Sequence, residues 1–399
     1  MLAPTSAADL AEMIRATDAP LSVQGGGTRG MARPGQPLTT SGITGIVEYT
    51  PGALTLIARA GTPIAEIEAA LDAEEQMLAF EPMDHRSLLG TGGTPTIGGV
   101  VAANVSGPRR VRAGACRDFI LGVRFVDGTG AVAQNGGKVM KNVTGYDLSK
   151  LMTGARGTLG VLTEISLKVL PKPKATATLS LHDIAPDQAV PAMSAALGTP
   201  YEVSGAFFGP YSDQGPRVAH IRLEGLANSV TYRVDRLKDV LGTFGTVTVE
   251  TDPDRNAAIW RGVRDLNMLK DMPFVACSGI KASVAPAILE TIGQTHTSTD
   301  FLDWGGARIW HGASEDQLVQ NAEFASDPSE RKNPDAGAAD LSATLSGMIG
   351  HDGGHTTVIK GPDVAKQAAI SNANPTVHRL NQGLRAKFDP RGILNGGPV

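Results

Sequence analysis

The stretch VQGGGTR, residues 23–29, decides the fold of this 399-residue chain. It overlaps the end of the short apolar segment 21–24, which predicts a strand, so three consecutive glycines stand where a strand passes into a loop. Glycine lacks a Cβ atom, and a run of glycines lets consecutive backbone N–H groups approach an anionic oxygen closely. Strand followed by glycine loop therefore indicates a binding loop for a phosphate-bearing ligand.

Two further glycine loops follow, GTGGTPTIGGVVAAN at 90–104 and GARGTLGV at 154–161. None of the three fits the G-x-x-x-x-G-K-S/T pattern of a P-loop. None supplies G-x-G-x-x-G between a strand and a helix with an acidic residue about 20 positions further on. The sequence thus argues against P-loop and Rossmann sites. One such loop could be an ordinary turn, but three in this order favour a nucleotide cofactor.

The flanking segments read as small α/β units. Ser6 and Asp9 have the spacing of a capping box and predict a first helix with Leu10, Met13 and Ile14 on one face.

Farther along, residues 54–60 predict a strand, and Thr62 as N-cap with Pro63 in the first turn predicts a helix. Alternation at 161–169 predicts a strand with one apolar and one mostly polar face, and PKPK at 171–174 then breaks regular structure. We expect a first domain at 1–173 with subdomains at about 1–80 and 81–173.

The segment 174–380 predicts an α+β cap domain with a mostly antiparallel sheet. The polar stretch 326–340 lacks apolar periodicity and predicts a mobile loop. The last residues, 381–399, carry Phe388, Ile393 and Leu394, which need a buried surface, and we expect them to return to the first domain. The expected strands are 176–181, 203–208, 218–223, 246–250, 274–280, 307–310 and 356–359, and the expected helices are 229–241 and 285–292.

Bulk composition excludes several classes. The formal net charge of -4 lacks the basic excess that nucleic-acid binding requires. Two cysteines are too few for an iron–sulfur cluster, so any such cluster would belong to a partner. The chain has no apolar run of about 18 residues and no signal peptide pattern, which predicts a cytoplasmic location. Any membrane association, at the inner face, would come through partners.

The glycine loops and the motifs around them resemble the FAD-binding superfamily of vanillyl-alcohol oxidase and p-cresol methylhydroxylase. TIGGV at 96–100 and GTLGVLTE at 157–164 carry that resemblance. Within the superfamily, the chain is similar to the FAD-binding subunits of bacterial glycolate oxidases. The supporting motifs are DHRSLLG at 84–90, SGPRR at 106–110, VMKNVTGYD at 139–147 and FDPRGILN at 388–395.

The resemblance implies an α+β fold, with a two-subdomain p-cresol methylhydroxylase-type FAD-binding domain followed by the cap. It places Gly25–Arg29 on the pyrophosphate of FAD and the neighbourhood of Val161 on the adenine side. Arg29 stands where members with covalent flavin often carry a histidine, so non-covalent FAD is expected. The implied cofactor-binding residues are Val23, Gln24, Gly25, Gly26, Gly27, Thr28, Arg29, Pro82, Gly90, Thr94, Ile97, Gly98, Gly99, Ala102, Asn104, Ser106, Gly107, Gly160, Val161 and Asn395.

Catalytic candidates are weak. Lys141, Asn142 and Tyr146 offer donors for an anionic flavin or a carboxylate, but Thr144 and Asp147 have capping-box spacing that explains the segment without catalysis.

The sequence does not indicate a metal site or a cysteine that binds the flavin covalently. We expect no metal site: His351 and His355 form an HDGGH segment without a fuller set of ligands, and His311 falls at the end of a cap strand. Cys116 is expected to be a buried free thiol.

The resemblance implies a subunit of a glycolate oxidase (dehydrogenase) complex that oxidises glycolate to glyoxylate. Its partners would be a larger homologous FAD subunit and an iron–sulfur subunit that receives the electrons. Two alternatives stay open. One is a self-sufficient FAD-dependent oxidase or dehydrogenase of another 2-hydroxy acid or an alditol. The other is a flavin-binding structural subunit without a role in electron transfer.

Overall fold

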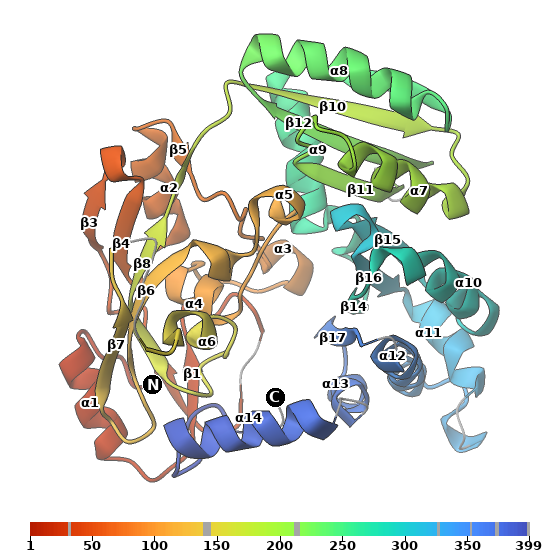
Figure 1. The fold of residues 1–399 in the computed structure, drawn as a ribbon. Coiled ribbons are helices and arrows are strands. Elements are labelled where there is room, and N and C mark those ends of the chain that lie inside the picture. The colour runs from red at the N-terminus through yellow and green to blue at the C-terminus, as the bar shows by residue number, and fades with distance from the viewer. Residues whose placement is uncertain are drawn as a thin grey trace. The chain divides into compact units, whose positions relative to one another are not determined.

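A computed structural model describes residues 1–30, 33–138, 145–210, 216–324, 328–351, 353–371 and 375–396. The chain forms two compact units (Figure 1). Unit 1 contains Met1–Gly107, Ala113–Lys172 and Thr376–Val399, and unit 2 contains Pro108–Arg112 and Pro173–Pro375. The short helix α5 (Arg110–Ala113) spans the second crossing between them.

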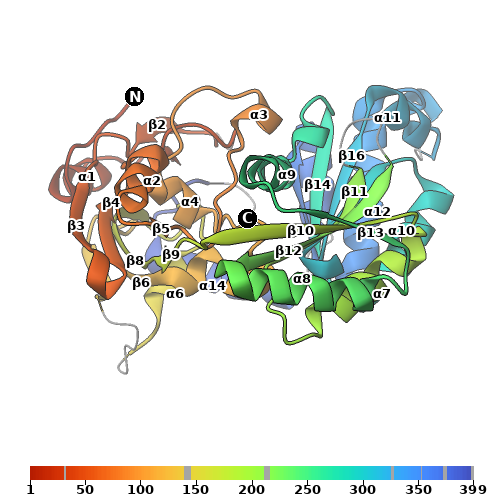
Figure 2. The same ribbon diagram turned by 90° about the horizontal axis from the view of Figure 1, so that it is seen from above.

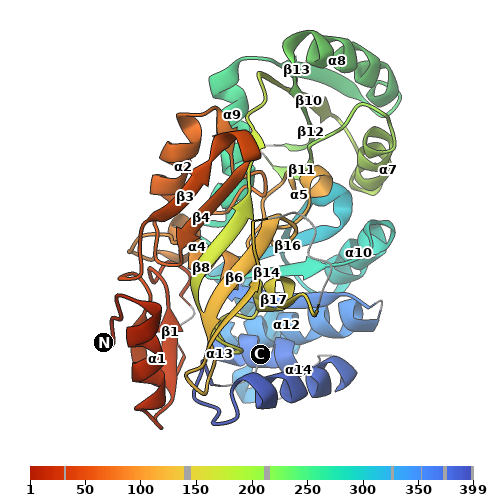
Figure 3. The ribbon, with the colours of Figure 1, turned by 60° about the vertical axis from the view of Figure 1, so that its left-hand side comes forward.

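Unit 1 is built on a five-stranded antiparallel sheet of order β3-β4-β8-β6-β7, in which β3, β4, β8 and β6 lie side by side (Figure 3). Its strands come from both sides of residue 80, so the stretches 1–80 and 81–173 share one sheet. Unit 1 also contains two separate two-stranded sheets, one formed by β1 and β2 and the other by β5 and β9. The strands are β1 Leu21–Gln24, β2 Gln36–Thr39, β3 Ile46–Thr50, β4 Thr55–Arg59, β5 Gln76–Met77, β6 Ile120–Val126, β7 Val132–Gly136, β8 Val161–Lys168 and β9 Leu170–Pro171.

The first two helices of unit 1 begin at different kinds of cap. Ser6 caps the first helix by accepting a hydrogen bond from the Asp9 amide, as predicted, although the Asp9 carboxylate reaches back to Thr5. The second helix is capped differently from the prediction. Pro63 is its N-cap, and the Thr62 hydroxyl donates to the Arg59 carbonyl instead. The helices are α1 Ala7–Arg15, α2 Ile64–Asp72, α3 Arg86–Leu89, α4 Ile97–Ala102, α6 Leu148–Met152 and α14 Pro375–Phe388.

Strand β8 corrects a second expectation. Residues on both of its faces are buried, including Leu162 and Ser166 on the face expected to be mostly polar, because β8 lies in the middle of the sheet between β4 and β6. Thr163, on the other face, is buried as well. The Thr163 hydroxyl is satisfied by donating to the Arg124 carbonyl at 3.1 Å. Mid-sheet burial therefore overrides the alternation seen in the sequence.

Unit 2 is built on an eight-stranded antiparallel sheet of order β13-β10-β12-β11-β15-β16-β14-β17, which confirms the predicted antiparallel cap. All seven expected strands form, and the strand at 299–303 was not predicted. The strands are β10 Ala175–His182, β11 Gly205–Pro210, β12 Arg217–Gly225, β13 Thr246–Glu250, β14 Phe274–Gly279, β15 Thr299–Asp303, β16 Arg308–Ala313 and β17 His355–Lys360.

Residues of six helices, α7, α8, α10, α11, α12 and α13, contribute to the apolar core on one face of this sheet, while α9 covers β10 from the opposite side (Figure 2). The indole N–H of Trp260 in α9 donates to Thr178 of β10 at 2.8 Å. The helices are α7 Pro186–Leu197, α8 Ala227–Leu241, α9 Pro253–Asp265, α10 Ala285–Thr295, α11 Glu315–Asn321, α12 Pro334–His351 and α13 Asp363–Ser371.

The expectation of a mobile loop at 326–340 is wrong for its second half. Helix α12 begins at Pro334, and its residues Ala338 and Leu341 are fully buried in the core of unit 2. Gly337 allows this packing, because a Cβ there would clash with the Leu318 carbonyl oxygen. Residues 325–327 lie outside the described part of the chain.

Candidate functional site

The three glycine loops meet around one cavity in unit 1. Thirteen of the twenty predicted cofactor-binding residues line it: Val23, Gln24, Gly25, Gly26, Gly27, Thr28, Arg29, Gly98, Gly99, Ala102, Gly160, Val161 and Asn395. The structure adds nine residues to the lining: Gly30, Arg33, Thr40, Ala103, Met152, Arg156, Gly157, Thr158 and Leu162. The cavity volume is about 180 Å³.

The first loop presents donors to this cavity. No backbone hydrogen bond from the amides of Gly25, Gly26, Gly27 or Thr28 to another described residue occurs in the structure. Their carbonyls are in part committed, since Gly25 accepts from Thr39 and Thr28 accepts from Thr91. Consecutive amides that donate to no described residue, in a glycine-lined cavity, suit the oxygens of a pyrophosphate.

The second loop supports the first one. A Cβ on Gly26 would clash with the Thr94 carbonyl oxygen, and a Cβ on Gly93 would clash with the Gly26 carbonyl oxygen, so the two loops pack backbone to backbone. The amides of Ile97 and Gly98 donate to the carbonyls of Thr62 and Ala60 at 3.0 and 2.8 Å. These two amides are therefore used within the protein and do not point at a ligand.

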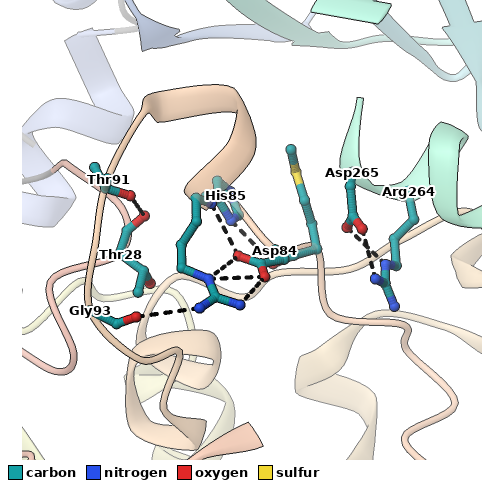
Figure 4. A network of polar contacts seen from close by, with 9 residues as sticks. Thr28, Asp84, His85, Thr91, Gly93, Arg264 and Asp265 are labelled. Carbon is teal, nitrogen blue, oxygen red and sulfur yellow. Dashed lines mark hydrogen bonds and ion pairs between the residues drawn. The ribbon is translucent and has the colours of Figure 1, made fainter. Parts of the chain in front are cut away.

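The segment 84–93 holds the first glycine loop in place through hydrogen bonds (Figure 4). The Thr91 hydroxyl donates to the Thr28 carbonyl at 2.8 Å, and Arg86 donates to the Gly93 carbonyl at 3.4 Å. Arg86 is itself held by Asp84, with a shortest contact of 2.7 Å. The motif DHRSLLG thus acts on the cavity through the loop it holds.

The third loop packs on the C-terminal end of α4. The amides of Gly154 and Arg156 donate to the carbonyls of Val101 and Ala102 at 3.0 and 2.8 Å, which satisfies two helix-end acceptors. Arg156 adopts a left-handed backbone with φ of 52°. The Arg156 carbonyl in turn accepts from the side chain of Asn395 at 2.8 Å.

Arg29 is one of three arginines that line the cavity, together with Arg33 and Arg156. Its Nε is buried and has no hydrogen-bond partner among the described residues. Burial lowers the pKa of Arg29 to about 10, while Asp84 and Cys116 oppose that shift, so the side chain remains charged at neutral pH. Gly99 leaves room for this side chain, because a Cβ there would lie 2.8 Å from the guanidinium. A buried guanidinium nitrogen without a hydrogen-bond partner favours an anion in the cavity.

Seven predicted cofactor residues lie outside the cavity lining, and their contact with a cofactor stays a prediction. Asn104 and Ser106 accept hydrogen bonds from the amides of Arg117 and Cys116, and Gly107 donates to the Phe80 carbonyl. The others are Pro82, which is buried; Gly90, the C-cap of α3; Thr94, whose carbonyl packs on the first loop; and Ile97, which is in the core.

The weak catalytic candidates do not join the site. Lys141 and Asn142 lie outside the described residues, as does Thr144. Tyr146 is 88% exposed and does not line the cavity. Asp147 is the N-cap of α6 and accepts from the Lys150 amide, so the cap is one turn later than the predicted capping box.

Thiols and metal ligands add no reactive group to the cavity. Cys116 is a buried free thiol, and burial raises its pKa, so it stays protonated. Within the described ranges, no three His, Cys, Asp or Glu residues gather to hold a metal ion. His351 ends α12 and His355 begins β17.

His311 lies inside β16 and not at its end, fully buried between Asp300 and Ser278 at 2.7 and 3.1 Å. None of these three side chains lines the glycine-lined cavity.

Comparisons with known proteins agree with this geometry. Residues 1–135 match the FAD binding domain family. Glycolate oxidase subunit GlcE of Escherichia coli (strain K12) is 36% identical over 388 residues, which cover 95% of this chain and 92% of that protein. Glycolate oxidase subunit GlcD of Bacillus subtilis (strain 168) is 43% identical over 84 residues, 21% of this chain and 18% of that protein.

The fold has solved counterparts. The structure of p-cresol methylhydroxylase superposes with a TM-score of 0.70 at 14% identity, covering 98% of this chain and 87% of that one. This confirms the predicted fold class, and the family match confirms FAD as the cofactor. In the part of the chain that is described, no helix has the length and apolarity to cross a membrane. The chain belongs to the FAD-dependent oxidoreductase family of glycolate oxidase subunits that includes GlcE.

Proposed function

We propose that this chain is the FAD-binding subunit of a complex that oxidises glycolate to glyoxylate. The FAD assignment rests most on one observation: the four amides of Gly25–Thr28, which donate to no described residue, lie in one cavity with Arg29, whose Nε is buried and has no partner among the described residues. The similarity to a protein named as a glycolate oxidase subunit supports the substrate and the assembly.

The cofactor would be bound without a covalent link. The chain has Arg29 at the end of the first loop, and a guanidinium cannot form the bond that a histidine makes in covalent flavoproteins. The first loop would hold the pyrophosphate, and Val161 with Gly160 would lie toward the adenine. When bound, FAD supplies an acceptor for the hydride of a 2-hydroxy acid. The protein residues bind and orient it.

The proposed division of the chain is an FAD-binding domain at 1–173 with the returning segment 381–399, and a cap at 174–380. The proposed partners are a larger homologous flavin subunit and an iron–sulfur subunit that takes up the electrons. Cytoplasmic location, with membrane association only through partners, belongs to the same proposal.

Anaerobic addition of glycolate tests this assignment. The chain is purified alone and together with its co-expressed partners, and the visible absorbance of FAD is followed in each sample. We expect the flavin of this chain to be reduced only in the assembled complex. Reduction in the isolated chain would identify a self-sufficient enzyme, and a flavin that stays oxidised within an active complex would identify a structural subunit.

A further inference from the structure

A second cavity lies within unit 2, where four neighbouring strands of the sheet begin or end. Its volume is about 480 Å³, within the range of small-molecule sites. Because β15, β16, β14 and β17 are antiparallel neighbours, the end of β14, the turn between β15 and β16, and the start of β17 meet there. The lining residues are Arg110, Val111, Gly279, Ile280, Lys281, Trp304, Ala307, Gly353, Gly354 and His355.

This cavity is basic. Arg110, Lys281 and His355 line it, and none of the described lining residues is acidic. Arg308 is not among the lining residues but adds positive charge close to one of them, because its guanidinium lies 3.7 Å from the ring centroid of Trp304. The guanidinium of Arg110 lies 4.4 Å from the same centroid. Two guanidinium groups on one indole ring concentrate like charge in a partly buried place, which favours an anion nearby.

One of these cations is incompletely satisfied. The Nε of Arg308 is buried and has no hydrogen-bond partner among the described residues. Leaving a buried charged donor without an acceptor is costly, so a compensating negative charge close to this group would be stabilising.

The segment that carries Arg110 is anchored firmly. The preceding residue, Arg109, donates to both carboxylate oxygens of Glu224 at 3.0 and 2.9 Å, and these two side chains are largely buried. Although burial opposes it, Arg222 and Arg109 lower the pKa of Glu224 to about 2, so the pair stays ionised. A bidentate pair of this kind fixes orientation as well as position, and it therefore presets Arg110 at the cavity.

We propose that this cavity binds a small oxyanion, a carboxylate or a phosphate, through Arg110, Lys281 and His355 against the wall of Trp304. All of its lining residues belong to unit 2, whereas the glycine-lined cavity belongs to unit 1. Carboxylate and phosphate share the oxygen geometry that guanidinium and ammonium donors recognise.

Trp304 supplies the measurement. The FAD-loaded full-length protein is titrated with oxalate and, separately, with inorganic phosphate at constant ionic strength, and tryptophan fluorescence is followed together with calorimetry. We expect saturable binding at about 10 mM or below for at least one anion. Saturation by oxalate alone identifies a carboxylate site, and saturation by phosphate identifies the phosphate class.

Matched variants make the test specific. Lys281→Gln should weaken binding about tenfold, the effect of losing one charge-assisted hydrogen bond, and Arg110→Gln should weaken it at least as much. Lys238→Gln, an exposed change in α8 of the same unit, should leave the affinity unchanged. FAD content, read from visible absorbance, should be normal in every variant. Absence of saturable binding by either anion, or equal affinity in Lys281→Gln and the unmodified protein, would overturn the proposal.

Discussion

The side chain of Asn395 pairs with both backbone groups of Val23, although 372 positions separate the two residues. Its Oδ1 accepts from the Val23 amide at 2.6 Å, and its Nδ2 donates to the Val23 carbonyl at 3.2 Å. Leu394, one residue before, forms a parallel bridge with Leu21, and Ile393 is buried in the same core as Leu10 and Leu21. The last residues of the chain thus hold the strand that feeds the first glycine loop.

Replacing Asn395 with alanine should therefore weaken FAD retention and stability together. The change leaves the Val23 amide and the Arg156 carbonyl without their side-chain partners in a place where Asn395 is 6% exposed. The expected loss is about 1–3 kcal/mol of unfolding free energy. Urea unfolding and the ratio of flavin to protein absorbance measure the two effects, and deletion of 384–399 should exceed both.

Asn228→Ala, an exposed change in α8, is the matched control and should alter neither quantity. If Asn395→Ala keeps native flavin content and stability, the C-terminal segment does not support the cavity.

Two glycines of the cavity should not tolerate valine. A Cβ on Gly26 would clash with the Thr94 carbonyl oxygen, and one on Gly98 would lie 2.7 Å from both the Cβ and the carbonyl oxygen of Ala60. Both obstacles include backbone, which cannot move aside cheaply. We expect Gly26→Val and Gly98→Val to purify without FAD or to fail to fold, whereas Gly52→Ala, with open space at its Cβ, should bind FAD normally. Full flavin occupancy in both valine variants would show that the loops do not enclose the cofactor.

Arg29 should contribute charge to FAD binding but no covalent bond. Arg29→Met keeps most of the length of the side chain and removes the cation, so the affinity for FAD should fall about tenfold or more, as expected for a charge-assisted contact. Equilibrium dialysis of the apoprotein with FAD measures this affinity. Acid precipitation of the unmodified protein should release all of its FAD into the supernatant. Flavin that stays with the precipitate would contradict the non-covalent assignment.

Sequence alone predicted the elements that local pattern controls. The bounds of β1 and β13 match their predicted residues, and the first glycine loop lines the cavity from Val23 to Arg29. The residues of these segments predict their structure without help from the rest of the chain. Runs of residues that favour strands predict β1 and β13, and consecutive glycines predict a loop whose backbone packs closely against its neighbours.

The elements that were missed depend on tertiary contacts. Strand β15 contains two aspartates, and Asp300 is tolerated there because His311 on the neighbouring strand pairs with it at 2.7 Å. Helix α12 is rich in glycine, serine and alanine, so its sequence gives little sign of a buried helix. The close approach of Gly337 to the Leu318 carbonyl, which explains the glycine, is visible only in the folded structure.

The cavity shows the same limit. Met152 and Arg156 line the cavity because the third glycine loop packs on the C-terminal end of α4. No local sequence pattern predicts that contact. Asn104 and Ser106 carry a family motif, yet in the structure their hydrogen bonds are to Arg117 and Cys116.

Acid should destabilise the protein partly through His220. This side chain is buried beside Ser180, with its Nδ1 2.9 Å from the serine hydroxyl and its ring stacked near Phe207. Burial, helped by the charge of His182, lowers the pKa of His220 to about 4 from the ordinary 6.5.

The lowered pKa of His220 makes the unfolding free energy depend on pH. The unfolded chain takes up the proton first, so the contribution of His220 is fully present above about pH 6.5 and is lost as the pH falls through 4. Its full size is roughly 3 kcal/mol. Between pH 6.5 and 4, His220→Gln should therefore lose less unfolding free energy than the unmodified protein does, which urea unfolding at pH 7, 6 and 5 measures. His378→Gln, at an exposed position in α14, should follow the unmodified protein at every pH. Parallel pH profiles for His220→Gln and the unmodified protein would show that His220 is not held neutral in the fold.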